Sequence, residues 1–344
     1  MTEQLALYRK YRPESFKEVR DQDHIVSVLE GAIKKRAVPH AMIFSGTRGT
    51  GKTTMARIVA RELGVADVDL YEIDAASNRG IDDVRELKEA VHTLPYQSEK
   101  KVYIIDEVHM LTKEAFNALL KTIEEPPEHV VFMMATTEID KVLDTILSRC
   151  QVFTLHSPSR SVLAKTVTDV AKKEGFTLKP DAADMIAIAA DGSFRDALGV
   201  LQKVILASGD KIGDGDEVAA IIGAPKTAAL ESLVQALHEK DAATALKAIA
   251  DAAESQTDMV LFTRLLLERL RAVMLLRNAP NDAERILAQL PPSGAEQVEK
   301  LAADAASPLN SHLLLRALEI SQLVRRASVP HLPLEVLVVE VCTK

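Results

Sequence analysis

The hydrophobic pattern divides the chain into two parts that differ in secondary structure. Up to about residue 156, short apolar runs alternate with segments whose apolar positions recur at helical spacing. The expected strands lie at 41–45, 68–74, 101–106, 130–136 and 151–155, and the expected helices lie near 52–63, 81–92, 113–124 and 141–148. This alternation predicts an α/β fold with a parallel sheet covered by helices.

Beyond residue 160 the pattern predicts helices and no further strand. Residues 161–222 have the spacing of a small set of helices, and from about residue 226 the chain is rich in Ala and Leu at helical spacing. We therefore expect three domains, which are an α/β domain over 1–157, a small helical domain over 158–224 and a larger helical domain over 225–344.

The composition is that of a soluble globular protein, with 47% apolar and 27% charged residues. The apolar runs are short and broken by charges, so we expect no membrane span. The N-terminal residues lack the features of a signal peptide. The two cysteines, Cys150 and Cys342, exclude a disulfide framework and an all-cysteine metal site within one chain. We expect a cytoplasmic protein.

A phosphate-binding loop follows the first expected strand. The segment FSGTRGTGKTT contains Gly46, four further residues, Gly51, Lys52 and Thr53, and it opens an expected helix, which is the context that the P-loop motif requires. Backbone N–H groups would wrap the phosphates of ATP, Lys52 would neutralise the β- and γ-phosphates, and Thr53 would bind Mg²⁺. The candidate nucleotide-binding residues are Gly46, Thr47, Arg48, Gly49, Thr50, Gly51, Lys52, Thr53 and Thr54.

The net charge is −8, so any contact with nucleic acid has to be local. Residues 31–61 hold seven Lys and Arg residues and no Asp or Glu. Most charge runs are solvated helix faces. Because this run contains the phosphate loop, a polyanionic partner is the favoured interpretation.

Two acidic residues end the strand KVYIID. Asp106 is expected to hold Mg²⁺ through water, and Glu107 is placed to orient and deprotonate an attacking water. A lone histidine is more often structural, so His109 receives no chemical role. The next strand ends in Thr136 and Thr137, where a hydroxyl either contacts the γ-phosphate or merely suits a strand end. The spacing leaves both interpretations of Thr137 open.

Several ordered stretches resemble the AAA+ clamp-loader ATPases, most closely their gamma/tau group. The matching stretches are LYRKYRPESFKEV, GTRGTGKTT, EIDAASNRGIDDVREL, YIIDEVHML, FNALLKTIEEPPEHVVFMMATT, ILSRCQVF, GSFRDAL and LPLEVLVVEV. The resemblance spans nearly the whole chain and is densest over residues 5–200. It implies an AAA+ domain, a helical lid domain and a helical collar for oligomerisation.

The resemblance also assigns roles to matching positions. It implies that Thr137 is the first sensor and that Arg195, on the lid, is the second. It implies that Arg149 of the SRC segment is an arginine finger, which reaches the γ-phosphate held by a neighbouring subunit. The sequence shows no carboxylate within one helical turn of Arg149, and a partner on another chain would account for that.

The remaining implications concern adenine, zinc and DNA. The adenine site would consist of Tyr8, Arg12, Pro13 and Val19, although Asp21 replaces a customary Gly and suggests a different turn there. The zinc module that usually follows the P-loop helix has no cysteines here, so we expect no zinc. DNA phosphates would meet Asn78, Arg79 and Arg85, but helix capping and an ion pair explain these residues equally well.

The function expected from these features is an ATPase that opens a sliding clamp and loads it on primed DNA. The implied partners are other clamp-loader subunits in a pentamer of this and related chains, the sliding clamp and primed DNA, with no membrane. One alternative is a structural subunit of the same assembly that hydrolyses no ATP. Another is a different AAA+ DNA motor, for recombination or branch migration.

Overall fold

The computed structural model describes residues 5–78, 80–208, 212–213, 215–287, 290, 292–304 and 307–342. Its contacts group the chain into two compact units, Met1–Asp214 and Gly215–Lys344, which we call the N-terminal and the C-terminal unit. Within the described ranges, no helix is both long enough and apolar enough to cross a membrane. The expected domain boundaries at 157 and 224 stay predictions.

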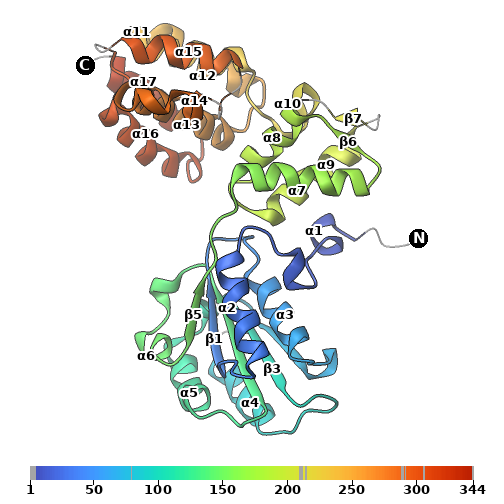
Figure 1. Cartoon of the computed structure of the whole chain (residues 1–344). Coiled ribbons are helices and arrows are strands. Elements are labelled where there is room, and N and C mark those ends of the chain that lie inside the picture. Colours follow the sequence, from blue (N-terminus) through green and yellow to red (C-terminus); the bar gives the residue numbers. More distant parts are fainter. Residues whose placement is uncertain are drawn as a thin grey trace. The chain divides into compact units, whose positions relative to one another are not determined.

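Five parallel strands form the sheet of the N-terminal unit, in the order β2-β3-β4-β1-β5 (Figure 1). They are β1 (Ala41–Ser45), β2 (Leu70–Asp74), β3 (Lys101–Asp106), β4 (Val130–Thr136) and β5 (Gln151–Thr154). Their neighbours are α2 (Asp23–Lys34), α3 (Lys52–Glu62), α4 (Ile81–Val91), α5 (Lys113–Glu124) and α6 (Asp144–Leu147), with short 3-10 helices η1 (Phe16–Glu18), η2 (Asp67–Asp69), η3 (Val108–Met110) and η4 (Ile139–Lys141). This confirms the predicted α/β class.

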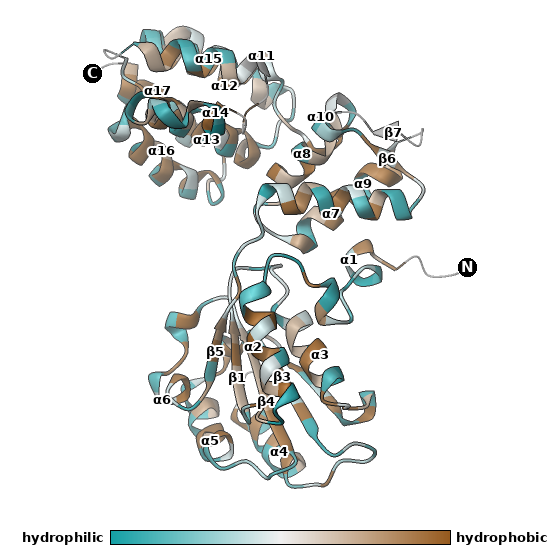
Figure 2. Ribbon diagram, viewed as in Figure 1, coloured by the Kyte–Doolittle hydropathy of each residue, from teal (hydrophilic) through white to brown (hydrophobic). Residues whose placement is uncertain are grey.

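The central strands are apolar on both faces because helices cover both (Figure 2). Successive residues of β1 point to opposite sides: Met42 and Phe44 join a core with α2 and α3, whereas Ala41 and Ile43 join a core with α4 and α5. Burial of each large side chain stabilises the layers by roughly 1.5–3 kcal/mol. The parallel order brings the carboxyl ends of β1, β3 and β4 to one edge of the sheet.

Further helices of the N-terminal unit follow the sheet. These lid helices are α7 (Arg160–Lys173), α8 (Pro180–Ala189) and α9 (Phe194–Ala207). The expectation that strands end at residue 160 is wrong, because β6 (Thr177–Leu178) pairs with β7 (Ile212–Gly213). Such two-residue strands are too short for periodicity to reveal them.

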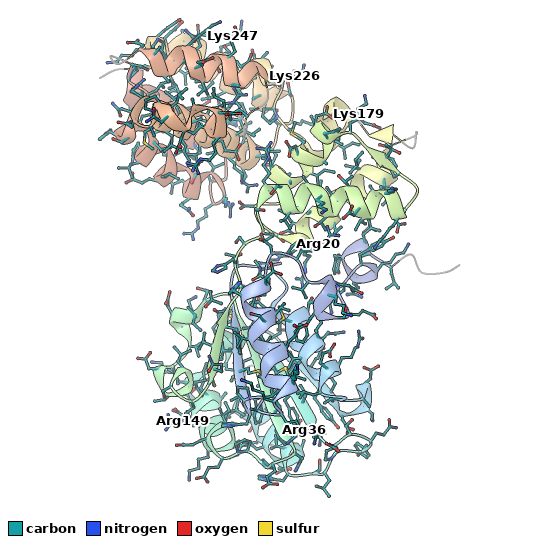
Figure 3. All side chains as sticks on the ribbon, in the orientation of Figure 1. Arg20, Arg36, Arg149, Lys179, Lys226 and Lys247 are labelled. Carbon is teal, nitrogen blue, oxygen red and sulfur yellow. The ribbon has the colours of Figure 1, made fainter. Side chains whose placement is uncertain are left out.

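The N-terminal segment is fastened to the lid helices. Helix α1 (Leu7–Lys10) packs against α9, and the Leu7 N–H donates to Gln202 Oε1 over 3.1 Å. Lys10 and Tyr11 both bind Glu174, at the end of α7. Arg20, which Figure 3 labels, forms an ion pair with Asp169 of α7 at 2.8 Å. The segment that precedes the sheet therefore lies along the lid.

A short link with no cysteine joins α3 to β2. Its last residue, Asp69, is fully buried and accepts the backbone N–H groups of Tyr96, Gln97 and Ser98 over 2.6–2.9 Å. Burial raises the pKa of Asp69, but these hydrogen bonds outweigh it and lower the pKa to about 2. The Asp69 carboxylate thus holds the loop between α4 and β3.

Replacing Asp69 by asparagine should destabilise the protein at neutral pH. We expect the melting temperature of Asp69→Asn to fall by about 3–6 °C at pH 7. A depressed folded-state pKa stabilises the fold above the unfolded-state pKa near ~4, and this stabilisation is lost as pH falls toward 2. Thermal unfolding of both proteins should therefore give curves that converge below pH 4. The exposed Asp82→Asn is the control, and a constant difference from pH 5 to pH 3 would contradict the assignment.

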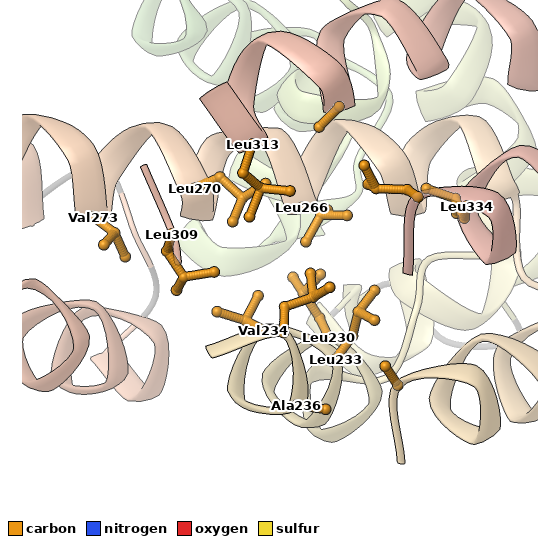
Figure 4. Packing of buried hydrophobic residues seen from close by; sticks show 14 of the residues in the cluster. Leu230, Leu233, Val234, Ala236, Leu266, Leu270, Val273, Leu309, Leu313 and Leu334 are labelled. Carbon is orange, nitrogen blue, oxygen red and sulfur yellow. The ribbon is translucent and has the colours of Figure 1, made fainter. Parts of the chain in front are cut away.

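The C-terminal unit is helical and has its own core. Its elements are α10 (Gly215–Ile222), α11 (Thr227–Glu239), α12 (Ala242–Glu254), α13 (Met259–Asn278), η5 (Pro280–Asp282), α14 (Ala283–Leu287), α15 (Pro292–Ala303), α16 (Ser311–Val324) and α17 (Leu332–Cys342). Leu233 of α11, Leu266 and Leu270 of α13 and Leu313 of α16 meet in one cluster (Figure 4). Arg316 joins α16 to α17 through Glu340 at 2.6 Å.

Candidate functional site

The phosphate loop connects β1 to α3 in a conformation that requires glycine. Gly46, Gly49 and Gly51 have φ angles of 146°, 76° and 104°. A Cβ atom on Gly49 would lie 1.9 Å from Ser193 Oγ at the start of α9. The Phe194 N–H of α9 donates to the Gly49 carbonyl over 3.0 Å. The absence of a side chain at Gly49 therefore lets the lid contact the loop directly, which the motif alone did not reveal.

Lys52 lies at the first position of α3 and is 6% exposed. Its Nζ donates to the carbonyls of Gly46 and Thr47, each over 2.9 Å. Burial lowers the pKa of Lys52, while the carboxylates of Glu107 and Asp106 act in the opposite direction. Two of the three ammonium protons thus orient the side chain, and the third can meet a phosphate oxygen.

The acidic pair lies across from Lys52. Asp106 ends β3, and its Oδ2 accepts the hydroxyl of Thr53 over 2.8 Å. This places one hydroxyl and one carboxylate together, both of which are oxygen ligands that suit Mg²⁺ when phosphate oxygens complete the shell. Glu107 follows with a left-handed φ of 48°, an uncommon conformation for a residue with a side chain.

Glu107 makes its contacts with the end of β4. Its Oε2 accepts the hydroxyl of Thr137 over 3.0 Å and the backbone N–H of Thr137 over 3.3 Å. The ring of His109, whose side chain is 5% exposed, has Nδ1 at 2.9 Å from Thr136 Oγ1 and at 3.5 Å from Glu107 Oε2. The structure thus brings Thr137 and Glu107 together, and adds a histidine that sequence reasoning had set aside.

A cavity of about 630 Å³ lies between the phosphate loop and the lid helices. Lys52, Thr53, Asp106 and Glu107 line one part of it, and Arg195 of α9 lines another. The Arg195 guanidinium lies 5.7 Å from the centre of the Tyr8 ring, within the range of a cation–π contact. The cavity accordingly combines a cationic end, whose charge suits phosphate, with an aromatic residue.

The four residues expected at adenine, Tyr8, Arg12, Pro13 and Val19, all line this cavity. Burial lowers the pKa of Arg12, and the positive charges of the nearby Arg57 and Arg195 lower it further. Asp21 has a φ of 60°, a backbone conformation that glycine enters most easily. Its Oδ2 also accepts the Ser159 N–H over 2.9 Å, which ties this turn to the start of the lid.

Comparison with known protein families places this site in context. Three family descriptions match successive parts of the chain: the delta subunit of DNA polymerase III over residues 62–159, the ATPase lid domain of a DNA polymerase III clamp-loader subunit over 163–210, and domain III of the DNA polymerase III subunits gamma and tau over 214–344. The chain belongs to the AAA+ clamp-loader family.

Curated relatives agree along almost the whole chain. DNA polymerase III subunit gamma/tau of Mycobacterium bovis is 36% identical over an alignment that covers 96% of this chain and 61% of that protein. DNA polymerase III subunit tau of Bacillus subtilis is 33% identical, with 98% and 63% covered. The chain therefore spans somewhat under two thirds of the length of these clamp-loader relatives.

A solved structure of a branch migration motor has a similar fold. The RuvB Holliday junction branch migration motor of Thermotoga maritima matches 67% of this chain and 80% of its own with a TM-score of 0.53. The sequences are only 21% identical, so this likeness concerns the fold.

Arg149 of this clamp-loader chain is not among the residues that line the cavity. It follows α6 and has an intrachain carboxylate partner, because its Nη2 lies 3.1 Å from Glu124 Oε1 at the end of α5. Its Nη1 donates to the Thr145 carbonyl over 2.7 Å. No carboxylate lies within one helical turn of Arg149, but the folded chain supplies Glu124, which is 25 residues away and too far for helical spacing to show it. In this structure Arg149 is therefore a paired surface arginine, and its role as a finger stays a prediction.

The residues expected at DNA have local contacts in this clamp-loader fold. The Asn78 side chain donates to the Asp74 carbonyl over 3.1 Å, and Arg85 forms an exposed ion pair with Asp82 at 2.8 Å. Arg79 lies outside the described residues. These contacts are those of a turn and a helix surface, so a role in DNA binding stays a prediction.

The basic stretch at residues 31–61 separates into three sets. Arg48 and Lys52 line the cavity. Arg57 binds Glu72, and Arg61 lies 3.3 Å from Glu14. Lys34 is exposed at the end of α2, where Figure 3 labels the nearby Arg36. A polyanion partner for the stretch is therefore best supported at the phosphate loop.

We expected no zinc because the segment after the P-loop helix contains no cysteine. Across the described ranges, no group of three or more His, Cys, Asp or Glu side chains is arranged to hold a metal ion. The absence of zinc stays a prediction.

Proposed function

We propose that this chain is an ATP-hydrolysing subunit of a sliding-clamp loader, which opens the clamp and loads it on primed DNA. The observation that carries the proposal is the convergence of Lys52, Thr53, Asp106 and Glu107 on one cavity that Arg195 of the lid also lines. A structural subunit would not need this set of groups. Membership of the clamp-loader family favours clamp loading over another AAA+ motor.

The residues that are present fit MgATP. Lys52, held by two loop carbonyls, would contact the β- and γ-phosphates together with the loop N–H groups. Thr53 and Asp106, already joined by a hydrogen bond, would hold Mg²⁺. The ion would neutralise charge on the transferred phosphoryl group. Arg195 would contact the phosphates from the lid.

Glu107 would orient the attacking water and accept its proton. The hydrogen bond from Thr137 would hold the Glu107 carboxylate at the end of β4. Thr137, the proposed first sensor, would thus contact the general base directly. Tyr8, Arg12, Pro13 and Val19 would enclose the adenine and the ribose of ATP. Because Tyr8 lies near Arg195, the nucleotide would connect the N-terminal segment to the lid.

Assembly would complete the site. We propose that Arg149 leaves Glu124 and reaches the γ-phosphate held by a neighbouring subunit. Exposed ion pairs contribute only about 0–1 kcal/mol to stability, so the exchange of Glu124 for a phosphate would cost little free energy. Helices of the C-terminal unit would form the collar of a pentamer of this and related chains, and Asn78, Arg79 and Arg85 would follow template phosphates.

The proposal is tested by steady-state ATP hydrolysis. We expect the protein, combined with its cognate clamp, partner subunits and primed DNA, to hydrolyse ATP faster than it does alone. Absence of hydrolysis under every condition would leave a structural subunit. Hydrolysis that responds to four-way DNA junctions but not to the clamp would instead indicate a branch-migration motor.

The loop held by Asp69 offers a surface for the clamp. Leu94 and Tyr96 are 75% and 78% exposed and lie two residues apart, and neighbouring exposed apolar side chains are typical of protein-binding surfaces. We expect Leu94→Ser with Tyr96→Ser to lower clamp affinity about tenfold or more, measured by surface plasmon resonance, with unchanged ATP affinity. Val28→Ser, at another exposed apolar position, is the matched control. Unchanged clamp affinity in the double variant would exclude this surface.

A further inference from the structure

His109 has no part in the function described above, yet it lies against the proposed general base. It belongs to η3, directly after β3, and its side chain is 5% exposed. Its Nδ1 is 2.9 Å from Thr136 Oγ1 and 3.5 Å from Glu107 Oε2, and its Nε2 is 3.4 Å from Glu138 Oε1. One ring thus contacts the ends of two neighbouring strands.

The surroundings of the ring limit where Glu107 can lie. Thr136 is fully buried, and its hydroxyl oxygen also accepts the backbone N–H of Glu138 over 3.0 Å. The Thr136 hydroxyl therefore anchors the His109 ring, through its Nδ1 atom, to the end of β4. The same Nδ1 atom lies 3.5 Å from Glu107 Oε2, and that oxygen accepts the Thr137 hydroxyl over 3.0 Å. Glu107 is itself one-third exposed and has an uncommon backbone conformation, so contacts of this kind decide its orientation.

We infer that His109 is a positioning residue for Glu107, which fixes the carboxylate between the ends of β3 and β4 where it can activate water. This inference rests on the proposed ATPase function. His109 is not among the cavity-lining residues, so its effect reaches the reacting atoms only through Glu107. A misplacement of about 1 Å in a catalytic group can lower turnover by as much as ~100-fold.

Turnover measurements separate positioning from a merely structural role. His109→Leu, which keeps bulk and removes both ring nitrogens, should lower the kcat for ATP about 30-fold, with nucleotide affinity changed by less than about threefold. His109→Asn, which keeps a polar group near the Nδ1 position, should stay within about threefold of wild type. His129→Leu is the matched control, because His129 also binds backbone carbonyls, but those of Val91 and Thr93 at the opposite end of the sheet. It should leave kcat unchanged.

A double-mutant cycle tests the route through Glu107. In the Glu107→Gln background, His109→Leu should change the residual rate by less than about twofold. An equal loss in both backgrounds, or a loss of nucleotide affinity that parallels the loss of kcat, would overturn the inference. So would an unchanged kcat in His109→Leu.

A measurement without turnover keeps the inference distinct from the ATPase proposal. In protein labelled with ¹⁵N-histidine, Glu107→Gln should shift the side-chain nitrogen resonances of His109 and leave those of His129 in place. Unshifted His109 resonances would overturn the inference even in an active enzyme. If the wild-type chain hydrolyses no ATP at all, the proposed function fails, and this spectrum still decides whether His109 contacts Glu107.

Discussion

Arg149→Ala should lower the ATP turnover of the assembled loader about 10³-fold or more, with nucleotide affinity nearly unchanged. An arginine finger contributes about 10³–10⁵ in kcat by neutralising charge that develops on the transferred phosphoryl group. The affinity for nucleotide should change little because Arg149 does not line the cavity of its own chain. Steady-state hydrolysis with clamp and primed DNA, together with equilibrium binding of a fluorescent ATP analogue, measures the two effects.

Glu124→Gln provides the matched control for this result. It removes the negative charge of the carboxylate that pairs with Arg149 and keeps the guanidinium. If Arg149 merely forms a structural ion pair, the two variants should behave alike. If it acts on phosphate, Glu124→Gln should retain most of the activity.

Mixing two inactive variants tests whether the finger acts on a neighbouring chain. Arg149→Ala chains keep the base, and Glu107→Gln chains keep the finger. Where they meet in the right order, one complete site forms at the interface, so the mixture should recover part of the activity. A mixture no more active than its components would place the finger in the same chain as the site that it serves.

Glu107→Gln should give the second large effect. Loss of a general base typically lowers kcat by about 10²–10⁴, whereas an amide of the same size preserves the hydrogen bond with Thr137 and hence the local structure. We expect ATP affinity to stay within about threefold, since Lys52, Thr53 and Asp106 are untouched. Single-turnover hydrolysis and filter binding report the two quantities.

The outcome for Glu107 is informative in either direction. An exposed acid on α5, substituted in Glu114→Gln, controls for the loss of one charge and should leave kcat unchanged. If Glu107→Gln retained full turnover, Glu107 would not be the base. The proposed role of His109 as its positioning residue would fall with it.

Local patterns along the chain were enough to predict the architecture of the candidate nucleotide site. The strands that precede Lys52 and Asp106 were recognisable because buried parallel strands are short, continuously apolar runs. The phosphate loop was recognisable because its glycines, lysine and threonine act within one strand–turn–helix unit, so its spacing survives as a local pattern. Functional groups gather at the carboxyl ends of parallel strands, so we could expect Asp106 and Thr137 to lie near each other.

The contacts between side chains of different elements became known only from the folded chain. Ser193 packs against Gly49, which is 144 residues away in the sequence. His109, after β3, contacts Thr136 at the end of β4, and Glu124 of α5 forms an ion pair with Arg149. Hydrophobic periodicity reports the face on which a residue lies, within about one turn of its neighbours. It carries no information on which distant face will pack against it. The role of His109 could therefore be stated only once the ends of β3 and β4 lay side by side.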